Sequence, residues 1–359
     1  MKYIVLYPKQ NQMNKIEQYK NIIEGDILIV QSKYMQYEEN LIKNECNIKV
    51  LCCHEEGIYW LRNNLKCSMS LTFNKECIKM TNKWETYRIF KKSNIPCVNK
   101  TISCDKINEF PIIAKPNIGF GSIGVQKINN REDLDGYIKK FDNMMKHSIV
   151  EEDRKIFFEN EVNFPIFEEC IENDQFFSVP FIVDSNKKIT IFPVVGLRKE
   201  NTTASNYKWA TFMYGNDILN KEIYNRIKNI VQDITDKWIR EPSVNLVEMV
   251  YDLGNDKLNV LEFSPRTVGG RISKMIEYAI GLNLDNISID LFFGINNFTI
   301  KEKKNKMTIL DICNVDANGK EVSGYSNEYL QKYELVDIEE TKSPIGNNLI
   351  KYKIYEREI

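Results

Sequence analysis

Two glutamates lie singly inside apolar runs of the sequence, and their type and spacing could do chemistry. Glu248 lies within residues 245–251 and Glu262 within residues 258–264, with a turn at residues 252–256 between them. A carboxylate inside an apolar strand is costly unless it is paired or binds a cation. Magnesium prefers hard oxygen ligands and bridges nucleotide phosphates, so two adjacent strands that each present a glutamate suit a magnesium site.

Ser264 and Arg266 follow the second glutamate directly. Arg266 offers a planar, permanently charged fork that suits a phosphoryl oxygen or a carboxylate. In a simpler interpretation, Glu248 and Glu262 face solvent on an edge strand and Arg266 pairs with one of them. Both interpretations allow a salt bridge, but only the first predicts a metal.

A glycine-rich stretch, Gly119-x-Gly121-x-x-Gly124, lies between an apolar strand at residues 111–116 and a second at 125–128. The dinucleotide fingerprint needs a helix after the loop, a Walker loop ends in Gly-Lys-Ser/Thr, and kinases carry further signatures that are missing here. What remains is a flap whose backbone N–H groups can close over phosphates, with Lys115 supplying positive charge. A flexible surface hairpin with a solvated lysine is the simpler alternative.

Composition excludes several classes of protein. Lys and Arg number 49 against 50 Asp and Glu, so the net charge of -1 gives no field for binding nucleic acid. Only two histidines occur and the nine cysteines are scattered, so any metal should have oxygen ligands. The first seven residues read as a strand rather than a signal, and no apolar run suits a membrane span. We therefore expect a cytoplasmic protein with neither membrane nor nucleic-acid partners.

Strands and helices alternate in a way that would position these residues. At 359 residues, the chain should form two or three subdomains around a cleft. Periodicity predicts helices at residues 73–94, 131–146 and 221–239. It predicts strands at residues 3–7, 26–30, 49–53, 176–183, 189–195, 246–251, 258–263, 309–313 and 349–355.

Taken together, the segments from about Thr81 to about Leu284 resemble the ATP-grasp superfamily. Lys83, with Asn82 before it, is similar to the family's Asp-Lys element, and Lys115 to its nucleotide-binding lysine. The flap corresponds to residues 119–125, which include Gly121 and Ser122. Glu248, Glu262, Ser264 and Arg266 resemble the metal and phosphate signature, with Ser264 where the family has asparagine.

The same resemblance implies a nucleotide hinge near residues 166–171. Glu168, Glu169 and Ile171 match the segment that holds adenine, and Gln175 falls where the family has a ribose-binding glutamate. Residues 266–278, with Gly269 and Gly270, are similar to the carboxylate-amine ligase branch, which includes amino-acid ligases. Residues 198–214 would form either a cover over the acceptor side or an ordinary surface loop.

The implied fold is an α/β N-terminal domain at residues 1–80, followed by an ATP-grasp fold of two α+β subdomains that grip ATP. These subdomains would occupy residues 81–165 and 166–300, with an accessory segment at 301–359. The implied reaction joins a carboxylate to an amine through an acyl phosphate, with ATP and Mg²⁺, or Mn²⁺ in its place. The phosphates of ATP would be bound by Lys83 and Lys115, and the acyl phosphate by Arg266. The protein could form a homodimer.

Three alternatives remain open from sequence alone. An ATP-grasp enzyme could activate bicarbonate, as carboxylases and carbamoyl-phosphate-forming enzymes do. A nucleotide-binding sensor without turnover is suggested by Asn82, Gln175 and Ser264, which all depart from the family's pattern. A nicotinamide oxidoreductase would rest on the glycine pattern alone. The donor and acceptor substrates stay undefined.

Overall fold

The computed structural model describes most of the chain, in fourteen stretches. They are residues 2–31, 47–65, 69–119, 124–148, 163–172, 174–198, 209–215, 218–269, 271–296, 298–300, 306–315, 321–322, 330–342 and 349–358. Gly121, Ser122 and most of the expected cover at 198–214 therefore lie outside the described residues. No helix in the described stretches is long and apolar enough to cross a membrane.

A parallel four-stranded sheet opens the chain, in the order β2-β1-β3-β4. Its strands are β1 (Lys2–Leu6), β2 (Asp26–Val30), β3 (Ile48–Cys52) and β4 (Met69–Leu71), accompanied by α1 (Gln10–Tyr19) and α3 (Glu55–Asn64). The three strands predicted here agree with β1, β2 and β3 to within one residue. Because β1 and β3 run parallel, α1 and α3 begin at the same edge of the sheet.

A second four-stranded sheet, ordered β5-β8-β6-β7, is antiparallel. Its strands are β5 (Lys100–Thr101), β6 (Ile112–Pro116), β7 (Gln126–Ile128) and β8 (Pro165–Glu169), with η2 (Cys104–Lys106) in a connection. Helix α5 (Arg131–Ser148) buries Leu134, Tyr137 and Phe141 against this sheet. The boundary expected between residues 165 and 166 falls inside β8.

The single helix predicted over residues 73–94 is wrong in one respect. The structure has a 3₁₀ helix, η1 (Lys75–Thr81), and then α4 (Lys83–Lys92). Asn82 separates them because its backbone is extended and its side chain accepts a hydrogen bond from the Glu85 N–H at 2.9 Å. An amide oxygen in this position satisfies a helix N-terminus as well as a carboxylate does.

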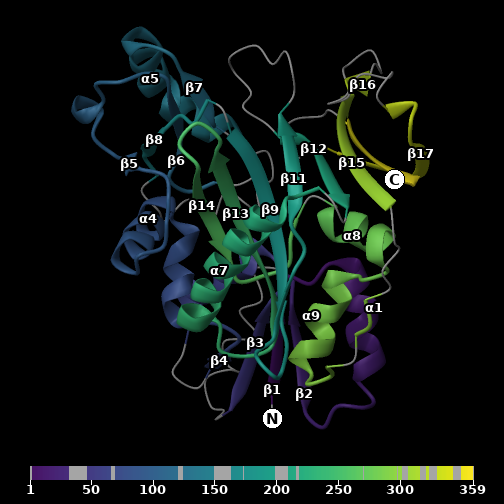
Figure 1. Ribbon diagram of the computed structural model, residues 1–359. Helices are drawn as coiled ribbons and strands as arrows, with labels where there is room; N and C mark the ends of the chain where they lie inside the picture. The colour runs from purple at the N-terminus through teal and green to yellow at the C-terminus, as the bar shows by residue number, and fades with distance from the viewer. Residues whose placement is uncertain are drawn as a thin grey trace.

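The largest sheet has ten strands and runs through the centre of Figure 1. It contains β9 (Asp174–Val183), β10 (Ile189–Ile191), β11 (Val194–Arg198), β12 (Trp209–Gly215), β13 (Ser243–Asp252), β14 (Lys257–Ser264), β15 (Lys306–Val315), β16 (Glu321–Val322), β17 (Glu334–Lys342) and β18 (Leu349–Glu358). The strand predicted over 189–195 is two strands, because Pro193 between them has no N–H to donate. Strands from the expected accessory segment extend this same sheet.

Helices cover both faces of the large sheet. Helix α7 (Lys221–Trp238) packs on one face, against alternate residues of β9 such as Phe177 and Phe181. Helices α8 (Ile272–Ile280) and α9 (Leu284–Phe292) pack on the other, against Ile182 and Leu246. Alternation along β9 and β13 therefore assigns each side chain to one of two distinct cores.

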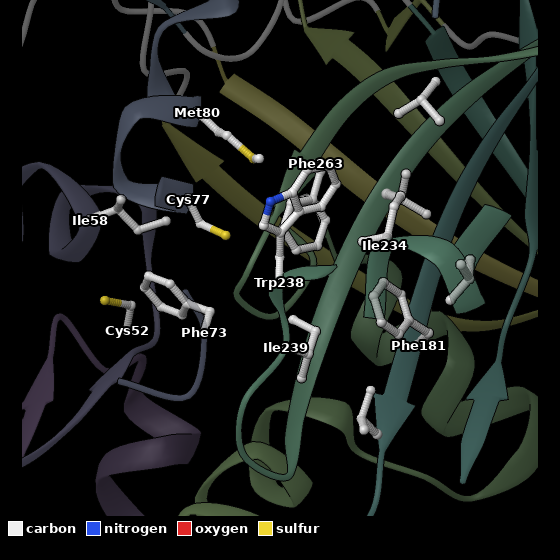
Figure 2. Close-up of a cluster of buried hydrophobic side chains, with 14 of the residues drawn as sticks. Cys52, Ile58, Phe73, Cys77, Met80, Phe181, Ile234, Trp238, Ile239 and Phe263 are labelled. Carbon is white, nitrogen blue, oxygen red and sulfur yellow. The ribbon is translucent and has the colours of Figure 1, made fainter. Parts of the chain in front are cut away.

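One hydrophobic cluster joins the N-terminal sheet to the large sheet. Figure 2 shows Trp238 beside Phe263, with Phe73 and Cys77 on the N-terminal side of the same cluster. The Trp238 indole stacks at 6.1 Å on Phe263 and donates to the Glu76 carboxylate at 3.1 Å. The position of the N-terminal sheet relative to β13 and β14 is therefore fixed by packing.

We expect Trp238→Ala to lower the free energy of unfolding by about 3–5 kcal/mol, because it removes a buried aromatic side chain at this junction. Ile22→Ala is the matched control, since Ile22 is 68% exposed and its loss should change stability by less than about 0.5 kcal/mol. Denaturant unfolding of both variants measures the difference. Equal stabilities of the two variants would contradict the role given to this cluster.

Candidate active site

Glu248 and Glu262 are directly opposite each other on β13 and β14. Antiparallel partners in register point to the same face of a sheet, so their carboxylates lie side by side. Burial raises the pKa of Glu248 to about 7, with the negative charge of Glu262 adding to the effect. The paired arrangement inferred from the sequence is therefore present, and it concentrates negative charge that a cation would relieve.

Ser264 provides a buried hydroxyl two residues beyond Glu262 on the same strand. Within the described stretches, no three His, Cys, Asp or Glu side chains gather into a group that could hold a metal. A cation here would therefore rely on two carboxylates, a neutral oxygen and non-protein ligands. That donor set fits magnesium, which binds through one or two carboxylates and keeps water or phosphate oxygens.

Three cations act on this carboxylate pair from different segments. Positive charge from Arg266, Lys115 and Lys83 lowers the pKa of Glu248 and partly offsets its burial. Lys115 lies on β6 of the small sheet and Lys83 begins α4, whereas Arg266 follows β14. The structure thus brings together the main cationic and anionic residues predicted from sequence.

Arg266 is held by a residue that sequence reasoning missed. Its Nη2 donates to Glu55 Oε2 at 3.1 Å, and the two side chains are only 12% and 14% exposed. Burial raises the pKa of Glu55, the charge of Arg266 opposes this, and Glu262 adds to the increase. The sequence did carry one signal for Glu55. This glutamate lies in the first turn of a helix that directly follows strand β3, at the carboxyl edge where parallel sheets place functional groups.

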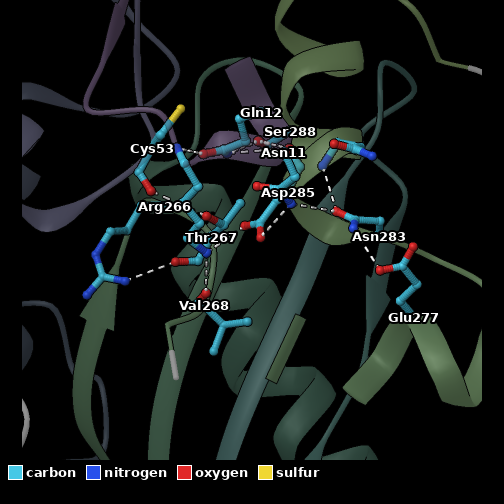
Figure 3. Close-up of polar contacts among 12 residues, drawn as sticks. Asn11, Gln12, Cys53, Arg266, Thr267, Val268, Glu277, Asn283, Asp285 and Ser288 are labelled. Carbon is cyan, nitrogen blue, oxygen red and sulfur yellow. Dashed lines mark hydrogen bonds and ion pairs between the residues drawn. The ribbon is translucent and has the colours of Figure 1, made fainter. Parts of the chain in front are cut away.

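The segment that carries Arg266 is docked on the N-terminal domain at three consecutive residues. Figure 3 shows these residues, Arg266, Thr267 and Val268, with Cys53 beside them. After the Arg266–Glu55 pair, the Thr267 hydroxyl donates to the Cys53 carbonyl at 3.4 Å. Lys9 Nζ then donates to the Val268 carbonyl at 3.1 Å and pairs with Asp285 at 2.8 Å. The carboxyl edge of the first sheet therefore fixes the backbone beside Arg266.

Lys115 is paired with Glu168, at an ion-pair distance of 2.6 Å. Burial lowers the pKa of Lys115, while the charge of Glu168 raises it. Burial alone would raise the pKa of Glu168, but the charges of Lys100 and Lys115 outweigh it and lower the pKa to about 2. Glu168 is therefore an ionised, buried partner of lysines, a setting that the sequence did not indicate.

Lys83 contacts the start of the glycine-rich stretch. Its Nζ donates to the Gly119 carbonyl at 2.7 Å, and its N–H donates to the Asn117 carbonyl at 3.0 Å. The Asn117 side chain accepts from the Trp84 N–H at 2.9 Å, which ties the first turn of α4 to the same stretch. Lys83 is thus positioned by the base of the flap that the sequence predicted.

The predicted hinge residues lie where the chain passes from the small sheet to the large one. Glu169 ends β8, exposed to solvent, and accepts a hydrogen bond from Asn99 at 2.7 Å. Ile171 follows in the connection, and Gln175 lies on β9 opposite Tyr251 of β13. Their proposed contacts with a nucleotide stay predictions.

Residues 108–275 match the family model of an ATP-grasp domain. No curated protein matches the chain at a significant level. Among solved structures, an L-amino acid ligase from Bacillus licheniformis is similar over 100% of this chain and 94% of its own, with a TM-score of 0.65 and 10% identity. These values describe a likeness of fold.

Two further structures show the same likeness with different reactions. An N5-carboxyaminoimidazole synthase from Aspergillus clavatus, in complex with ADP and 5-aminoimidazole ribonucleotide, covers 100% of this chain and 93% of its own (TM-score 0.64, 11% identity). The biotin carboxylase domain of Hydrogenobacter thermophilus 2-oxoglutarate carboxylase, with MgADP and bicarbonate, covers 99% and 85% (TM-score 0.62, 14% identity).

The raised pKa of Glu248 predicts a pH-dependent stability for the metal-free protein. A carboxyl whose pKa is higher folded than unfolded stabilises the fold at low pH, and that contribution is lost as pH rises toward about 7. Glu248→Gln should therefore raise the free energy of unfolding at pH 8 by about 1–2 kcal/mol and have little effect at pH 4.

Unfolding at both pH values, in the presence of a chelator, measures this effect. Glu109→Gln serves as control, because Glu109 is exposed and its change should be the same at either pH. A Glu248→Gln variant whose change in the free energy of unfolding is the same at pH 4 and pH 8 would show that burial and Glu262 do not raise the pKa of Glu248.

Proposed function

Because residues 108–275 match the family model of an ATP-grasp domain and the whole chain resembles a solved L-amino acid ligase in fold, we propose that it is an ATP-dependent carboxylate–amine ligase of the ATP-grasp superfamily. It would form an amide bond through an acyl phosphate and release ADP and phosphate. The observation that carries this proposal is the convergence of Glu248, Glu262 and Arg266 with Lys83 and Lys115. Such a set of charges suits phosphoryl transfer, in which catalysis rests on positioning and electrostatic stabilisation.

ATP would lie between the small and large sheets, as two subdomains of an ATP-grasp unit. Its adenine would contact the hinge at Glu168, Glu169 and Ile171, and Gln175 would accept a hydrogen bond from ribose. Lys83 and Lys115 would contact phosphates, beneath a flap that includes Gly121 and Ser122. The Asn82 departure from the family's pattern does not weaken this proposal, because Asn82 caps α4 as an aspartate would.

Glu248, Glu262 and Ser264 would hold Mg²⁺. When bound there, the ion supplies Lewis-acid stabilisation of charge on the transferred phosphoryl group. The two carboxylates are supported by opposite strands, so their separation is set by the sheet rather than by flexible loops. A rigid site of this kind costs little reorganisation during the reaction.

In the proposed reaction, a substrate carboxylate oxygen attacks the γ-phosphorus of ATP in line. The bond from that phosphorus to the bridging oxygen breaks, and ADP leaves with the electron pair. Arg266 would stabilise the resulting acyl phosphate through its guanidinium. An amine then attacks the acyl carbon, the bond to phosphate breaks, and the amine proton passes to phosphate or solvent.

A second candidate function is activation of bicarbonate by the same site. The observation that favours this second function is the likeness of fold to a biotin carboxylase domain, with a TM-score of 0.62. Bicarbonate would take the place of the organic carboxylate, and the product of the first step would be carboxyphosphate. The residues assigned above would keep their roles, so substrate panels rather than mutations distinguish the two candidates.

The central experiment measures ADP release from Mg-ATP across amino acids, small carboxylates and bicarbonate, with hydroxylamine as acceptor. A hydroxamate that appears with one class of acid identifies acyl-phosphate chemistry and its donor. Glu262→Gln should reduce turnover by about a hundredfold or more, because a carboxylate in the metal site is lost. AMP formation, or full activity in Glu262→Gln, would contradict the proposal.

Glu55→Gln tests the support given to Arg266 from the N-terminal domain. The guanidinium would lose its anionic partner, and we expect kcat/KM for the carboxylate to fall by about tenfold, with the KM for ATP unchanged. Glu56→Gln, one residue along α3, is the neighbouring comparison. Unchanged kinetics in Glu55→Gln would remove Glu55 from the site.

A further inference from the structure

Lys100 is a buried cation for which the proposed reaction has no use. Its side chain is 1% exposed, and its Nζ lies 2.6 Å from Glu168 Oε1. A lysine is seldom fully buried, because its charge must be matched by a partner inside the protein.

Lys100 shares its partner with Lys115. The Lys115 Nζ lies 2.6 Å from the same Oε1 atom of Glu168, and the Lys115 side chain is 12% exposed. Lys100 pairs directly with Glu168 across β5 and β8, and Ile113 of β6 occupies the opposite side of Glu168. Lys115 is two residues beyond Ile113, so all three charged side chains belong to one face of the small sheet.

The two lysines differ in what they can reach. Lys115 is the more exposed one, and its charge acts on Glu248 in the large sheet. Lys100 is enclosed and is paired with the Glu168 carboxylate. A lysine that leaves Glu168 for a phosphate would, without Lys100, abandon a buried and unpaired carboxylate, which is strongly unfavourable.

We propose that Lys100 is a positioning residue that keeps Glu168 neutralised, so that Lys115 can exchange this carboxylate for a phosphate of ATP. The inference rests on the proposed function, in which Lys115 binds a nucleotide phosphate. Lys100 then acts through Lys115 and touches no substrate. Lys100 lowers the free-energy cost of the nucleotide-bound state, in which Lys115 contacts phosphate, and adds no contact with the nucleotide itself.

The proposal makes the effects of two substitutions non-additive. Lys100→Met leaves Glu168 dependent on its pair with Lys115, and affinity for Mg-ATP should fall about tenfold or more. Adding Glu168→Gln removes the competing charge, so Lys100→Met/Glu168→Gln should bind Mg-ATP within about threefold of Glu168→Gln alone, which is the reference because Glu168 belongs to the proposed nucleotide hinge. A merely structural Lys100 would instead weaken binding in the Glu168→Gln background as much as in the unaltered protein.

Isothermal titration of Mg-ATP into the full-length variants measures these affinities, with thermal unfolding to identify any variant that does not fold. Lys15→Met is the control, because it removes a lysine of α1 from its ion pair with Asp290 of α9. Equal binding by the double variant and by Glu168→Gln supports the proposal. A Lys100→Met variant that folds and binds like Lys15→Met overturns it, as does a folded double variant that binds about tenfold more weakly than Glu168→Gln.

The same titration separates this inference from the proposed function. If the unaltered protein does not bind Mg-ATP, the proposed function fails before Lys100 is tested. If the unaltered protein binds and Lys115→Met weakens binding, the function's premise holds. Wild-type-like binding by Lys100→Met then refutes the positioning role alone.

Discussion

The structure depends on holding two carboxylates, Glu248 and Glu262, opposite each other in a partly buried sheet. Burial raises the pKa of Glu248 to about 7, and the negative charge of Glu262 beside it adds to the increase. Two like charges in this position are unfavourable, and they stay together only if the surrounding fold is stable enough to offset their free-energy cost. The cluster around Trp238, which packs directly on β14 through Phe263, supplies that stability.

The positive charges near this pair belong to separate parts of the chain, and each is held by its own local contact. Lys115 lies on the small sheet and pairs with Glu168, and Lys83 lies in the first turn of α4 and donates to the Gly119 carbonyl. Arg266 lies in the segment after β14 and pairs with Glu55. Opposite charges around a carboxylate pair are most effective when solvent is excluded, which the low exposure of Arg266 and Lys115 favours.

The sequence predicted the parts of this site that follow from local pattern. The ATP-grasp fold expected from the motifs is confirmed, and Glu248 and Glu262 were found because a charged residue inside an apolar strand is conspicuous. Glu55 could not be found in this way, since its partner Arg266 lies 211 residues away. Glu168 was predicted only as part of a nucleotide hinge. Its pairing with Lys100 was hidden, because only the pairing of β5 with β8 makes the two residues neighbours.

The failures in secondary structure have local physical causes of the same kind. Apolar spacing carried the predicted helix through residue 82, but the Asn82 side chain competes for the backbone and starts a new helix there. This break has a consequence for the site, because α4 begins at Lys83 and its first N–H groups are bound by Asn117 at the base of the glycine-rich stretch. In a continuous helix, Lys83 would lie in the middle of the helix instead of in its first turn. Asn82 is therefore part of what directs Lys83 toward Gly119, at the start of the glycine-rich stretch.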